Sequence, residues 1–383
     1  MKSKSTFSQD TDPYRAGIQI GEALQDIEPE VIFLFSSIHF NGSEELTEAI
    51  YDAIGTDELL LIGCTGDGFY ESEKVANVGV SALAINSSGK IRWKIDQEKG
   101  VGLDPYGVTN RCIKRLQNAC PETDVFFLFS DFRTDASEVM RAISDCTDKP
   151  VVGGFAADNY DMKRCFIYIN RQVVTDMVAL LSATGDFSFE IFTVHHKEPE
   201  GETGVITECA STTIQKINNL PAMRFVEEAV GKPLEYLDAG TITVNVMDPD
   251  NPRIMRHRSL LLSKNPDEDT DIQLFGGIAE GEKIQLCLTN PEQIVAEIQS
   301  VAASFDALSF HPSSAIVISC AGRKQLLGNI NQVEIDELKT AEKTPGAIAG
   351  FPSFGEIGPV KIGSGYTQSL FHNMTYVVFV FGA

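Results

Sequence analysis

Charged and polar side chains near the C-terminus occur in an order that suits the binding of a zwitterion. Arg323 closely follows an apolar, strand-like run, and a guanidinium group can bind a carboxylate through two parallel hydrogen bonds. Glu356 stands directly behind a glycine, where its carboxylate can accept hydrogen bonds from an ammonium group. Ser319, Ser353 and Asn373 can add further hydrogen bonds to the same ligand. The residue types leave an alternative open, in which Arg323 and Glu356 pair with each other or cap helices.

Glycine-bearing loops in the first half of the chain offer a second set of ligand-binding candidates. Glycine lets the backbone approach a ligand closely and leaves backbone N–H groups available. Tight turns alone would also explain these glycines. Because the loops follow apolar runs like the one before Arg323, we expect them to reach the same ligand from another domain. The candidates are Ser36, Cys64, Thr65, Asp67, Ser130, Gly154, Phe155 and Asp158.

The main alternative is an enzyme whose nucleophile is Cys64, Ser319 or Cys320. A thiol or hydroxyl needs an activating base beside it, and no histidine lies where the sequence pattern would bring it close. A serine hydrolase would place its nucleophile in Gly-x-Ser-x-Gly, whereas Ser353 comes one residue late for that motif. We therefore expect a binding protein rather than an enzyme, with no catalytic residue, cofactor or metal.

The apolar runs before these polar residues form a threefold repeat. Residues 31–37 read Val-Ile-Phe-Leu-Phe-Ser-Ser, residues 125–131 read Val-Phe-Phe-Leu-Phe-Ser-Asp, and residues 315–320 repeat the pattern more loosely. A polar helical stretch and a second apolar run with glycine follow each of them. Ser36 and Ser130 lie 94 positions apart. Gly63 and Gly153, which stand in the second apolar run of the first and of the second copy, lie 90 positions apart. This small drift indicates an internal duplication in the N-terminal half.

Runs without polar alternation indicate strands that are buried on both faces, and a helix between two of them makes a βαβ unit. Further strands are expected at 78–85 and 91–95, joined as a hairpin, and at 176–183 and 187–195 in the second copy. The sequence therefore predicts an α/β protein with mixed, mostly buried sheets flanked by helices. Its building block is a repeated βαβ-plus-hairpin unit.

The length of 383 residues fits two or three domains. The composition becomes acidic and rich in glycine and proline after Pro199, so we place the boundary near residue 205. The predicted domains are 1–205, which holds two copies about a pseudo-twofold axis, and 206–383, which holds the third copy. Ligand is expected to bind between them.

The charge balance excludes several classes of partner. Fifty-four acidic residues against 31 Lys and Arg give a formal net charge of −23, which repels nucleic acid and anionic lipid surfaces. The first residues lack the apolar segment of a secretion signal, and no run is as long as a membrane span. We expect a cytoplasmic protein that does not insert into membranes.

Several of these motifs together resemble the FIST proteins, which pair a FIST N-terminal with a FIST C-terminal domain. The first two are Gly-Cys-Thr-Gly-Asp-Gly at 63–68 and Gly-Gly-Phe-Ala-Ala-Asp at 153–158. The more specific ones are Cys-Ala-Gly-Arg at 320–323, Gly-Phe-Pro-Ser-Phe-Gly-Glu-Ile-Gly at 350–358 and Phe-His-Asn-Met-Thr at 371–375.

This resemblance covers nearly the whole chain. It implies a sensory module of bacterial and archaeal signal transduction that binds small ligands such as amino acids. The resemblance implies no catalytic residues in this chain. Since the two sensory domains take up the chain, we expect the protein to signal to a partner protein in trans.

Overall fold

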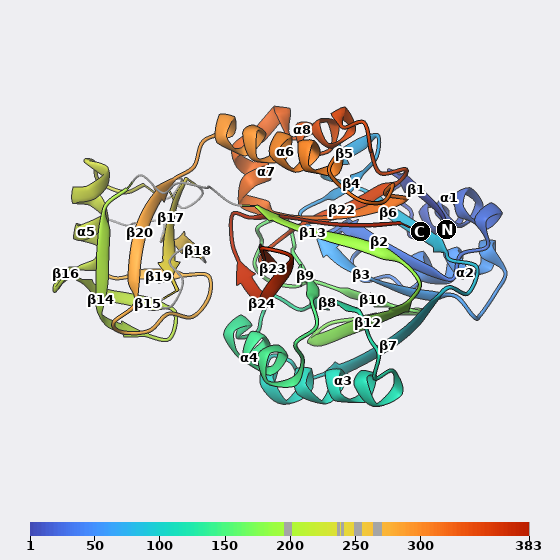
Figure 1. Ribbon diagram of the computed structural model, residues 1–383, viewed down its shortest axis with the longest axis horizontal. Coiled ribbons are helices and arrows are strands. Elements are labelled where there is room, and N and C mark those ends of the chain that lie inside the picture. Colours follow the sequence, from blue (N-terminus) through green and yellow to red (C-terminus); the bar gives the residue numbers. More distant parts are fainter. Residues whose placement is uncertain (195–200, 236–237, 239–240, 249–254, 263–269, 383) are drawn as a thin grey trace.

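The computed structural model describes the whole chain except residues 195–200, 236–237, 239–240, 249–254, 263–269 and 383. Figure 1 shows two bodies of unequal size. The larger one, which we call the three-sheet body, contains residues 1–194 and 291–382. The smaller one, the barrel, contains residues 203–288 and is inserted between two strands of the larger body.

The first sheet of the three-sheet body is formed mainly by the first copy of the repeat. Its six strands are, in spatial order, β1 (Lys2–Ser8), β6 (Val80–Asn86), β2 (Val31–Ser37), β3 (Leu60–Gly66), β10 (Ile167–Ile169) and β11 (Gln172–Val174). The central pair β2 and β3 is parallel, and every other neighbouring pair is antiparallel.

The second and third sheets have the same arrangement. The central parallel pair is β8 with β9 in the second sheet and β21 with β22 in the third. The order in the second is β7 (Ile91–Lys99), β12 (Met177–Gly185), β8 (Val125–Ser130), β9 (Val151–Phe155), β23 (Glu356–Ile362) and β24 (Gly365–His372). The order in the third is β13 (Ser188–Val194), β25 (Tyr376–Gly382), β21 (Ser314–Cys320), β22 (Ile348–Ser353), β4 (Phe69–Glu71) and β5 (Lys74–Ala76). The expected α/β fold with mixed sheets is therefore present, and three units share one strand order.

Each sheet is completed by a hairpin from another copy of the repeat. The hairpin β10–β11 pairs with β3, β23–β24 pairs with β9, and β4–β5 pairs with β22. The expected hairpin of 78–85 with 91–95 is wrong, because β6 and β7 lie in different sheets. The second expected hairpin is wrong for the same reason, since β12 pairs with β7 and β13 pairs with β25. These strands connect neighbouring sheets instead.

A glycine at the same register position allows each parallel pair to pack closely. A Cβ atom at Gly63 would lie 1.8 Å from the carbonyl oxygen of Leu34, and one at Gly153 would lie 1.8 Å from that of Leu128. The third copy repeats this at Gly350, where the distance to the Val317 carbonyl oxygen would be 1.9 Å. The glycines of the repeat are thus needed within the sheets, where only a residue without a side chain fits.

The three sheets pack against one another around a shared aromatic core. The first strands of the parallel pairs are buried along 31–35, 125–129 and 315–318, as their sequences predict. Phe33 and Phe127, from two different sheets, approach to 5.0 Å between ring centroids, and Phe127 approaches Phe379 of the third sheet to 4.9 Å. Burial of aromatic surface on this scale contributes the largest stabilising term to such a body.

Helices cover the outer face of each sheet (Figure 1). The first sheet has α1 (Pro13–Leu24) and α2 (Glu45–Ile54), the second has α3 (Pro105–Ala119) and α4 (Ala136–Cys146), and the third has α6 (Pro291–Phe305), α7 (Ala321–Leu327) and α8 (Val333–Asp336). Short 3₁₀ turns are η1 (Gln25–Ile27), η2 (Ile38–Phe40), η5 (Gly328–Ile330) and η6 (Glu337–Thr340). Asp12 caps α1 by accepting a hydrogen bond from the Arg15 N–H, and Asn290 forms a capping box with Gln293 at the start of α6.

The barrel has a separate apolar core. Its strands are, in spatial order, β14 (Thr203–Ala210), β20 (Lys283–Leu288), β17 (Ile242–Met247), β18 (Met255–Leu261), β19 (Ile272–Leu274), β15 (Thr213–Ile217) and β16 (Leu220–Pro221). Pairing of β14 with β15 closes the sheet on itself, and α5 (Ala222–Val230) packs against it. The predicted boundary near residue 205 falls within β14, where the chain has entered the barrel, and the chain returns to the three-sheet body with α6.

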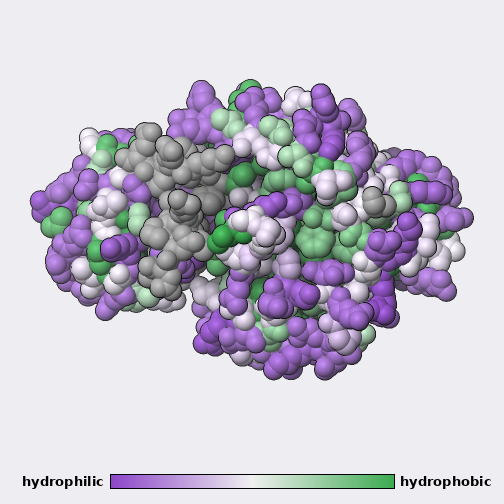
Figure 2. All heavy atoms as spheres, in the orientation of Figure 1, coloured by the Kyte–Doolittle hydropathy of each residue, from purple (hydrophilic) through white to green (hydrophobic). Residues whose placement is uncertain are grey.

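The face of the molecule that Figure 2 shows is mostly hydrophilic. Figure 2 shows polar residues over most of one face, with apolar residues gathered in patches over the middle of the three-sheet body. None of the helices in the described part of the chain combines the length and apolar character needed to cross a bilayer.

Candidate functional site

The carboxyl ends of the second strands of the three units meet, so the glycine loops of the N-terminal half lie beside the loop at 351–356. Backbone hydrogen bonds join each unit to the next, among them Ala157 N–H to Thr65 O (2.8 Å), Phe354 N–H to Phe155 O (3.1 Å) and Asp67 N–H to Pro352 O (2.9 Å). These bonds close a ring around a common axis. The structure therefore brings the loops at 64–67, 154–158 and 351–356 together, although they are separated by up to about 290 residues.

A cavity of about 320 Å³ lies beside this ring, between the three-sheet body and the barrel. The barrel supplies Ser259, Leu260, Leu261, Leu262 and Phe275 to its wall. The three-sheet body supplies Tyr160, Met162, Cys320, Ala321, Gly322, Gln325, Ser353, Phe354, Asn373 and Met374. No lysine, arginine, aspartate or glutamate is among the described residues that line it, so the wall is apolar with a few neutral hydrogen-bonding groups.

Asn373, one of the predicted ligand-binding residues, lines the cavity and also joins the two bodies. Its Oδ1 accepts a hydrogen bond from the Ser259 N–H at 3.2 Å, and its own N–H donates to the His257 carbonyl oxygen at 3.2 Å. Both partners belong to β18 of the barrel. A change in the position of Asn373 would therefore change how the barrel sits on the three-sheet body.

Ser353 is the other predicted ligand-binding residue that lines the cavity. Cys320, a candidate nucleophile of the enzyme alternative, lines it as well, and Glu356 lies behind both. The Ser353 hydroxyl donates to Glu356 Oε1 at 2.5 Å, and the Thr375 N–H donates to Oε2 at 3.2 Å. Burial raises the pKa of Glu356 to about 8, although these hydrogen bonds oppose the shift. Burial, together with the nearby Glu356, also raises the pKa of the Cys320 thiol. A neutral thiol of this kind is a weak nucleophile.

The structure does not bring Arg323 to the cavity. Its guanidinium group is fully buried, forms an ion pair with Glu297, lies 3.4 Å from Glu334 Oε1 and stacks 5.3 Å from the ring centroid of Tyr376. Burial alone would lower the pKa of Arg323, but the two glutamates more than offset this and raise it. Arg323 is paired with acidic residues of the chain itself. Glu356, its partner in the alternative that the residue types left open, is not among them.

Ser319 belongs to the same buried network. Its hydroxyl donates to Glu334 Oε1 at 2.6 Å. Tyr70 donates to the other carboxylate oxygen of Glu334, and Tyr376 donates to the Glu334 carbonyl oxygen. Ser319 is fully buried and is not among the residues that line the cavity, so it supports the third sheet from within.

The predicted residues of the first two units also lie in the interior. Ser36 hydrogen-bonds the Tyr168 hydroxyl at 2.6 Å, and the Thr65 hydroxyl accepts from the Phe166 N–H at 3.1 Å. The remaining ones, Cys64, Ser130, Gly154 and Phe155, are buried among neighbouring strands and line no part of the 320 Å³ cavity. Burial raises the pKa of the Cys64 thiol well above its usual value.

Asp158 acts on the cavity through the loop that follows it. Its carboxylate accepts three backbone hydrogen bonds, from Met162, Lys163 and Arg164, at 2.6 to 3.0 Å. The loop carries three non-glycine residues with left-handed backbone angles, which are Asn159, Tyr160 and Met162. Such angles need support from their surroundings, and Asp158 supplies it. Tyr160 and Met162 are thereby held, partly exposed, at the edge of the cavity.

Lys324 is a buried residue near the ring that sequence reasoning missed. Its ammonium group lies 3.4 Å from Asp67 Oδ2 and donates to the Asp67 carbonyl oxygen. Burial lowers the pKa of Lys324 and raises that of Asp67, and in each case the ion pair opposes the effect of burial. The pair joins the first unit to α7 of the third unit. Asp67 thus has an internal partner.

Sequence reasoning also missed the wall that the barrel provides. The run Ser-Leu-Leu-Leu at 259–262 reads as an ordinary strand end, and nothing in it indicates that it faces another body. A groove of about 500 Å³ continues the cavity and shares Met162, Phe275 and Phe354 with it. The apolar character of residues 259–262 was the available signal, because a strand end in solvent is usually polar.

Two domain families match the chain. The FIST N domain matches residues 7–220, and the FIST C domain matches residues 222–359. The chain belongs to the FIST family. FIST domains are associated with sensory signal transduction.

A relative of this FIST protein is the uncharacterized protein MJ1623 of Methanocaldococcus jannaschii. It is 25% identical over 349 residues, which cover 85% of this chain and 67% of the relative. Among solved structures, T. maritima PurL complexed with ATP aligns over all of this chain and 71% of that chain, at 12% identity with a TM-score of 0.21. The complex of T. maritima PurL with AMPPCP gives 11% identity and a TM-score of 0.22. Scores this low carry no argument about fold or function.

Proposed function

We propose that this FIST protein is a ligand-binding sensor whose site is the 320 Å³ cavity between the three-sheet body and the barrel. The observation that supports this most is that both bodies line the cavity. A ligand between two bodies makes contacts that depend on their relative position, so its binding favours one arrangement over another. Asn373 couples the cavity to β18 of the barrel.

The lining favours a small ligand that is largely apolar and uncharged. The sequence led us to expect an amino acid or a similar zwitterion bound by Arg323 and Glu356. Arg323 is paired within the core, and the raised pKa of Glu356 keeps that carboxyl mostly protonated near neutral pH. Burying an ionised ligand without a counter-charge is costly. An apolar body with one or two hydrogen-bonding groups, directed to Asn373, Ser353 and Gln325, suits this wall.

Signalling would proceed through contact with a separate protein when the barrel changes its position. The groove that continues the cavity contains Phe132, Phe155 and Phe371 with Arg133 and Asp135 at its edge. Its shape depends on both bodies, because Phe275 and Gly276 of the barrel line it as well. A partner that reads this groove would sense the presence of ligand in the adjoining cavity.

The buried thiols and hydroxyls support a binding role over covalent catalysis. The pKa of both candidate thiols is raised, and the Ser319 hydroxyl donates to a carboxylate in the interior. We therefore propose that the ligand leaves unchanged. Recovery of the ligand after prolonged incubation, followed by mass spectrometry, tests this, and a new product that depends on Cys320 would favour the enzyme.

The cavity is tested by filling it. Leu261→Trp adds bulk to the barrel side of the wall, where the native side chain is only partly buried. Small apolar alcohols, ketones and aromatic compounds are screened by thermal shift in parallel with amino acids. A ligand at 100 times its Kd adds about 2.7 kcal/mol of stability, and we expect Leu261→Trp to abolish the shift.

Leu288→Trp serves as the matched control, since Leu288 is an exposed barrel residue outside the cavity. It should leave the shift intact. A ligand that stabilises both variants equally would place the site elsewhere. A screen in which only amino acids respond would restore the zwitterion hypothesis and disprove the apolar one.

A further inference from the structure

We propose that the inter-body cavity selects its ligand by a hydrogen-bond acceptor, such as a ketone or ester oxygen, and that Ser353 reverses this selection when Glu356 ionises. The inference rests on the proposed function, because it concerns the ligand of the same cavity. It starts from two hydroxyl groups in the wall, one from each body. Ser259 of the barrel and Ser353 of the three-sheet body both line the cavity, and both are buried.

The hydroxyl group of Ser259 lacks a hydrogen-bond partner. The residue is only 8% exposed, and its Oγ makes no hydrogen bond within the described part of the chain. Its backbone N–H, by contrast, is bonded to Asn373 Oδ1. A buried hydroxyl without an acceptor is unfavourable. An oxygen atom of a ligand that accepts this hydrogen bond would remove that cost.

Ser353 offers the ligand a different group in each protonation state of Glu356. When Glu356 is ionised, the single hydroxyl hydrogen of Ser353 is donated to Glu356 Oε1 at 2.5 Å, and the Oγ accepts from the Gly355 N–H at 3.3 Å. A hydroxyl group has one hydrogen and two acceptor positions. Only an acceptor position is then left for the ligand, so the ionised form favours a ligand that donates.

Protonation of Glu356 reverses the bond to Ser353. Glu356 Oε2 accepts from the Thr375 N–H at 3.2 Å. A backbone donor cannot turn away as a hydroxyl can, so the added proton binds to Oε1, opposite Ser353. The carboxyl group then donates to Ser353, whose own hydrogen is free to point into the cavity. With Ser259 and Ser353 both acting as donors, the matching ligand is a small apolar ketone, ester or ether.

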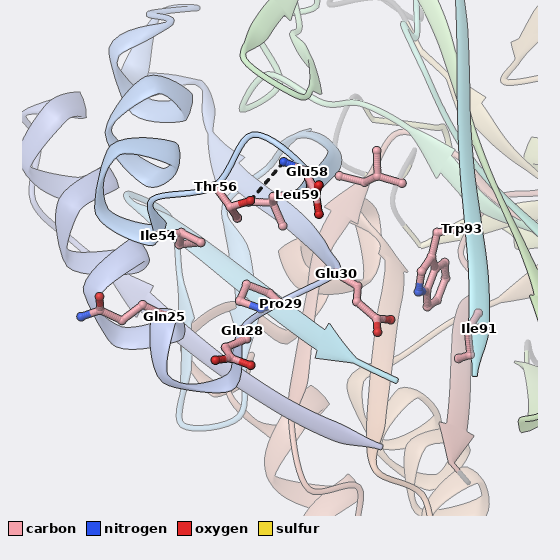
Figure 3. A pocket seen from close by; sticks show the side chains of 11 residues that line it. Gln25, Glu28, Pro29, Glu30, Ile54, Thr56, Glu58, Leu59, Ile91 and Trp93 are labelled. Carbon is pink, nitrogen blue, oxygen red and sulfur yellow. Dashed lines mark hydrogen bonds between the residues drawn. The ribbon is translucent and has the colours of Figure 1, made fainter. Parts of the chain in front are cut away.

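The position of Glu356 behind the cavity makes both protonation states accessible. Burial raises the pKa of Glu356 to about 8, against the hydrogen bonds that it accepts. Glu30, at the edge of an open pocket of about 500 Å³ (Figure 3), is the opposite case. It is half-buried, and although burial alone would raise it, hydrogen bonds from Ser87 and Gly89 lower the pKa of Glu30. The exchange of protonation states near pH 8 therefore belongs to the Glu356 site.

Other ionisable groups surround Glu356. Those that face it from neighbouring elements are Cys320 of β21, Arg323 of α7 and His372 of β24. Although burial alone would lower it, pairing with two glutamates raises the pKa of Arg323, and burial raises that of the Cys320 thiol. Arg258 of the barrel lies over the ring of Phe371, next to His372, and burial lowers its pKa to about 9. A variant that removes the Glu356 carboxyl alone is therefore needed to assign a pH effect.

The experiment uses the full chain and a matched pair of probes, acetophenone and 1-phenylethanol, which carry a carbonyl and a hydroxyl group at the same position. Both are titrated by calorimetry at about pH 6.5 and about pH 9.5. We expect the Kd of acetophenone to rise at least about tenfold at the higher pH, because the fraction of protein with protonated Glu356 falls. The alcohol can donate to the ionised form, so its Kd should change by less than about threefold. The same pH dependence for both probes would overturn the inference.

Variants assign the effect to the two hydroxyl groups. Glu356→Gln places an amide where it can donate to Ser353 at every pH, so this variant should bind acetophenone equally well at both pH values. Glu30→Gln is the matched control, because Glu30 lies outside the cavity and its pKa is lowered, and it should keep the wild-type pH dependence. Ser259→Ala removes one donor without changing Glu356, and it should weaken acetophenone binding about fivefold at both pH values.

The outcomes distinguish this inference from the proposed function. Acetophenone binding that Leu261→Trp abolishes but that does not vary with pH would overturn the inference and leave the cavity as the ligand site. A pH dependence that persists in Glu356→Gln would also overturn it. Binding of neither probe would have the same result, whereas the proposed function fails only if no compound of the wider screen gives a shift that Leu261→Trp abolishes.

Discussion

Arg323 illustrates how single buried charges are held in this molecule. Moving a guanidinium group into a protein interior is costly unless its hydrogen-bonding groups find partners. Glu297 and Glu334 supply opposite charge, and the Tyr376 ring covers one face. Glu334 in turn has donors of its own in Ser319 and Tyr70. The network thus connects α6, α8 and β21 with β4, which the first copy contributes.

Removal of Arg323 should therefore be strongly destabilising. Arg323→Ala leaves Glu297 and Glu334 buried without their counter-charge, and we expect the free energy of unfolding to fall by about 3–5 kcal/mol. Arg171→Ala is the matched control, because Arg171 pairs with Asp57 at the surface, and it should cost no more than about 1 kcal/mol. Urea denaturation followed by circular dichroism measures both. Equal losses in the two variants would contradict a structural role for the network.

Glu356 should make stability depend on pH. Its pKa is raised from 4.5 to about 8 in the folded protein, so the folded state binds this proton more tightly than the unfolded state. The contribution of Glu356 to stability therefore decreases as the pH rises from about 4.5 to 8, and levels off above that. The difference in unfolding free energy between wild type and Glu356→Gln should change by up to about 1.4 kcal/mol per pH unit in this window. A difference for Glu356→Gln that does not vary with pH would rule out the shifted pKa.

At the scale of elements, the parallel pairs depend on glycine for their spacing. Gly350 lies against the backbone of β21 so closely that a methyl group would overlap a carbonyl group. The backbone of a central strand cannot move aside without disturbing both neighbours. This explains why the second apolar run of every copy contains a glycine at the same register position.

Gly350→Ala should consequently cost more than a surface glycine substitution. We expect a loss of at least about 3 kcal/mol in unfolding free energy, above the usual range for an overpacked core. Gly365→Ala is the control, because a Cβ atom there meets nothing within 4 Å. Thermal and urea denaturation of both variants provide the comparison. A Gly350→Ala protein as stable as Gly365→Ala would show that the register is wrong.

The sequence allowed much of this element structure to be predicted, because runs such as Val31–Ser37 signal burial by themselves. The pairing of β6 and β7 could not be read from the sequence, since a short turn between two strands predicts a hairpin whether or not the strands separate into different sheets. Shared strand order supports the proposed duplication, which itself stays a prediction.

The candidate site was predictable in part, because the sequence shows which polar residues stand at the ends of apolar strands. The sequence placed Cys320, Ser353 and Asn373 at strand ends, and these line the cavity. It could not distinguish Arg323 from a ligand contact, because its partner Glu297 stands 26 positions earlier in the chain, on α6. The barrel's share of the wall depends on a contact between distant segments, which has no local signature.

At the scale of the whole molecule, the barrel is the part that can be separated. Its core contains no described residue of the three-sheet body, whereas each of the three sheets includes strands from another copy of the repeat. Replacing residues 203–288 by a flexible Gly-Ser linker should leave a folded three-sheet body with a cooperative thermal transition, and should abolish binding in the inter-body cavity. A fragment of residues 1–205, by contrast, lacks β21, β22 and β25 and should not fold cooperatively. Circular dichroism and calorimetry decide both points, and cooperative unfolding of the 1–205 fragment would argue against the interlocked sheets.

The exchange of hairpins also has a consequence for synthesis on the ribosome. The hairpin β4–β5 finds its partner only at β22, where Glu71 pairs with Ala349, 278 positions later. At a translation rate of about 5–20 residues per second, the hairpin β4–β5 remains without its partner strand for roughly 15–55 s after it is synthesised. The edge of β9 likewise remains unpaired until β23 has been synthesised. During translation the nascent chain therefore presents unpaired strand edges and aromatic surface for most of its elongation, a period in which chaperone capture competes with aggregation.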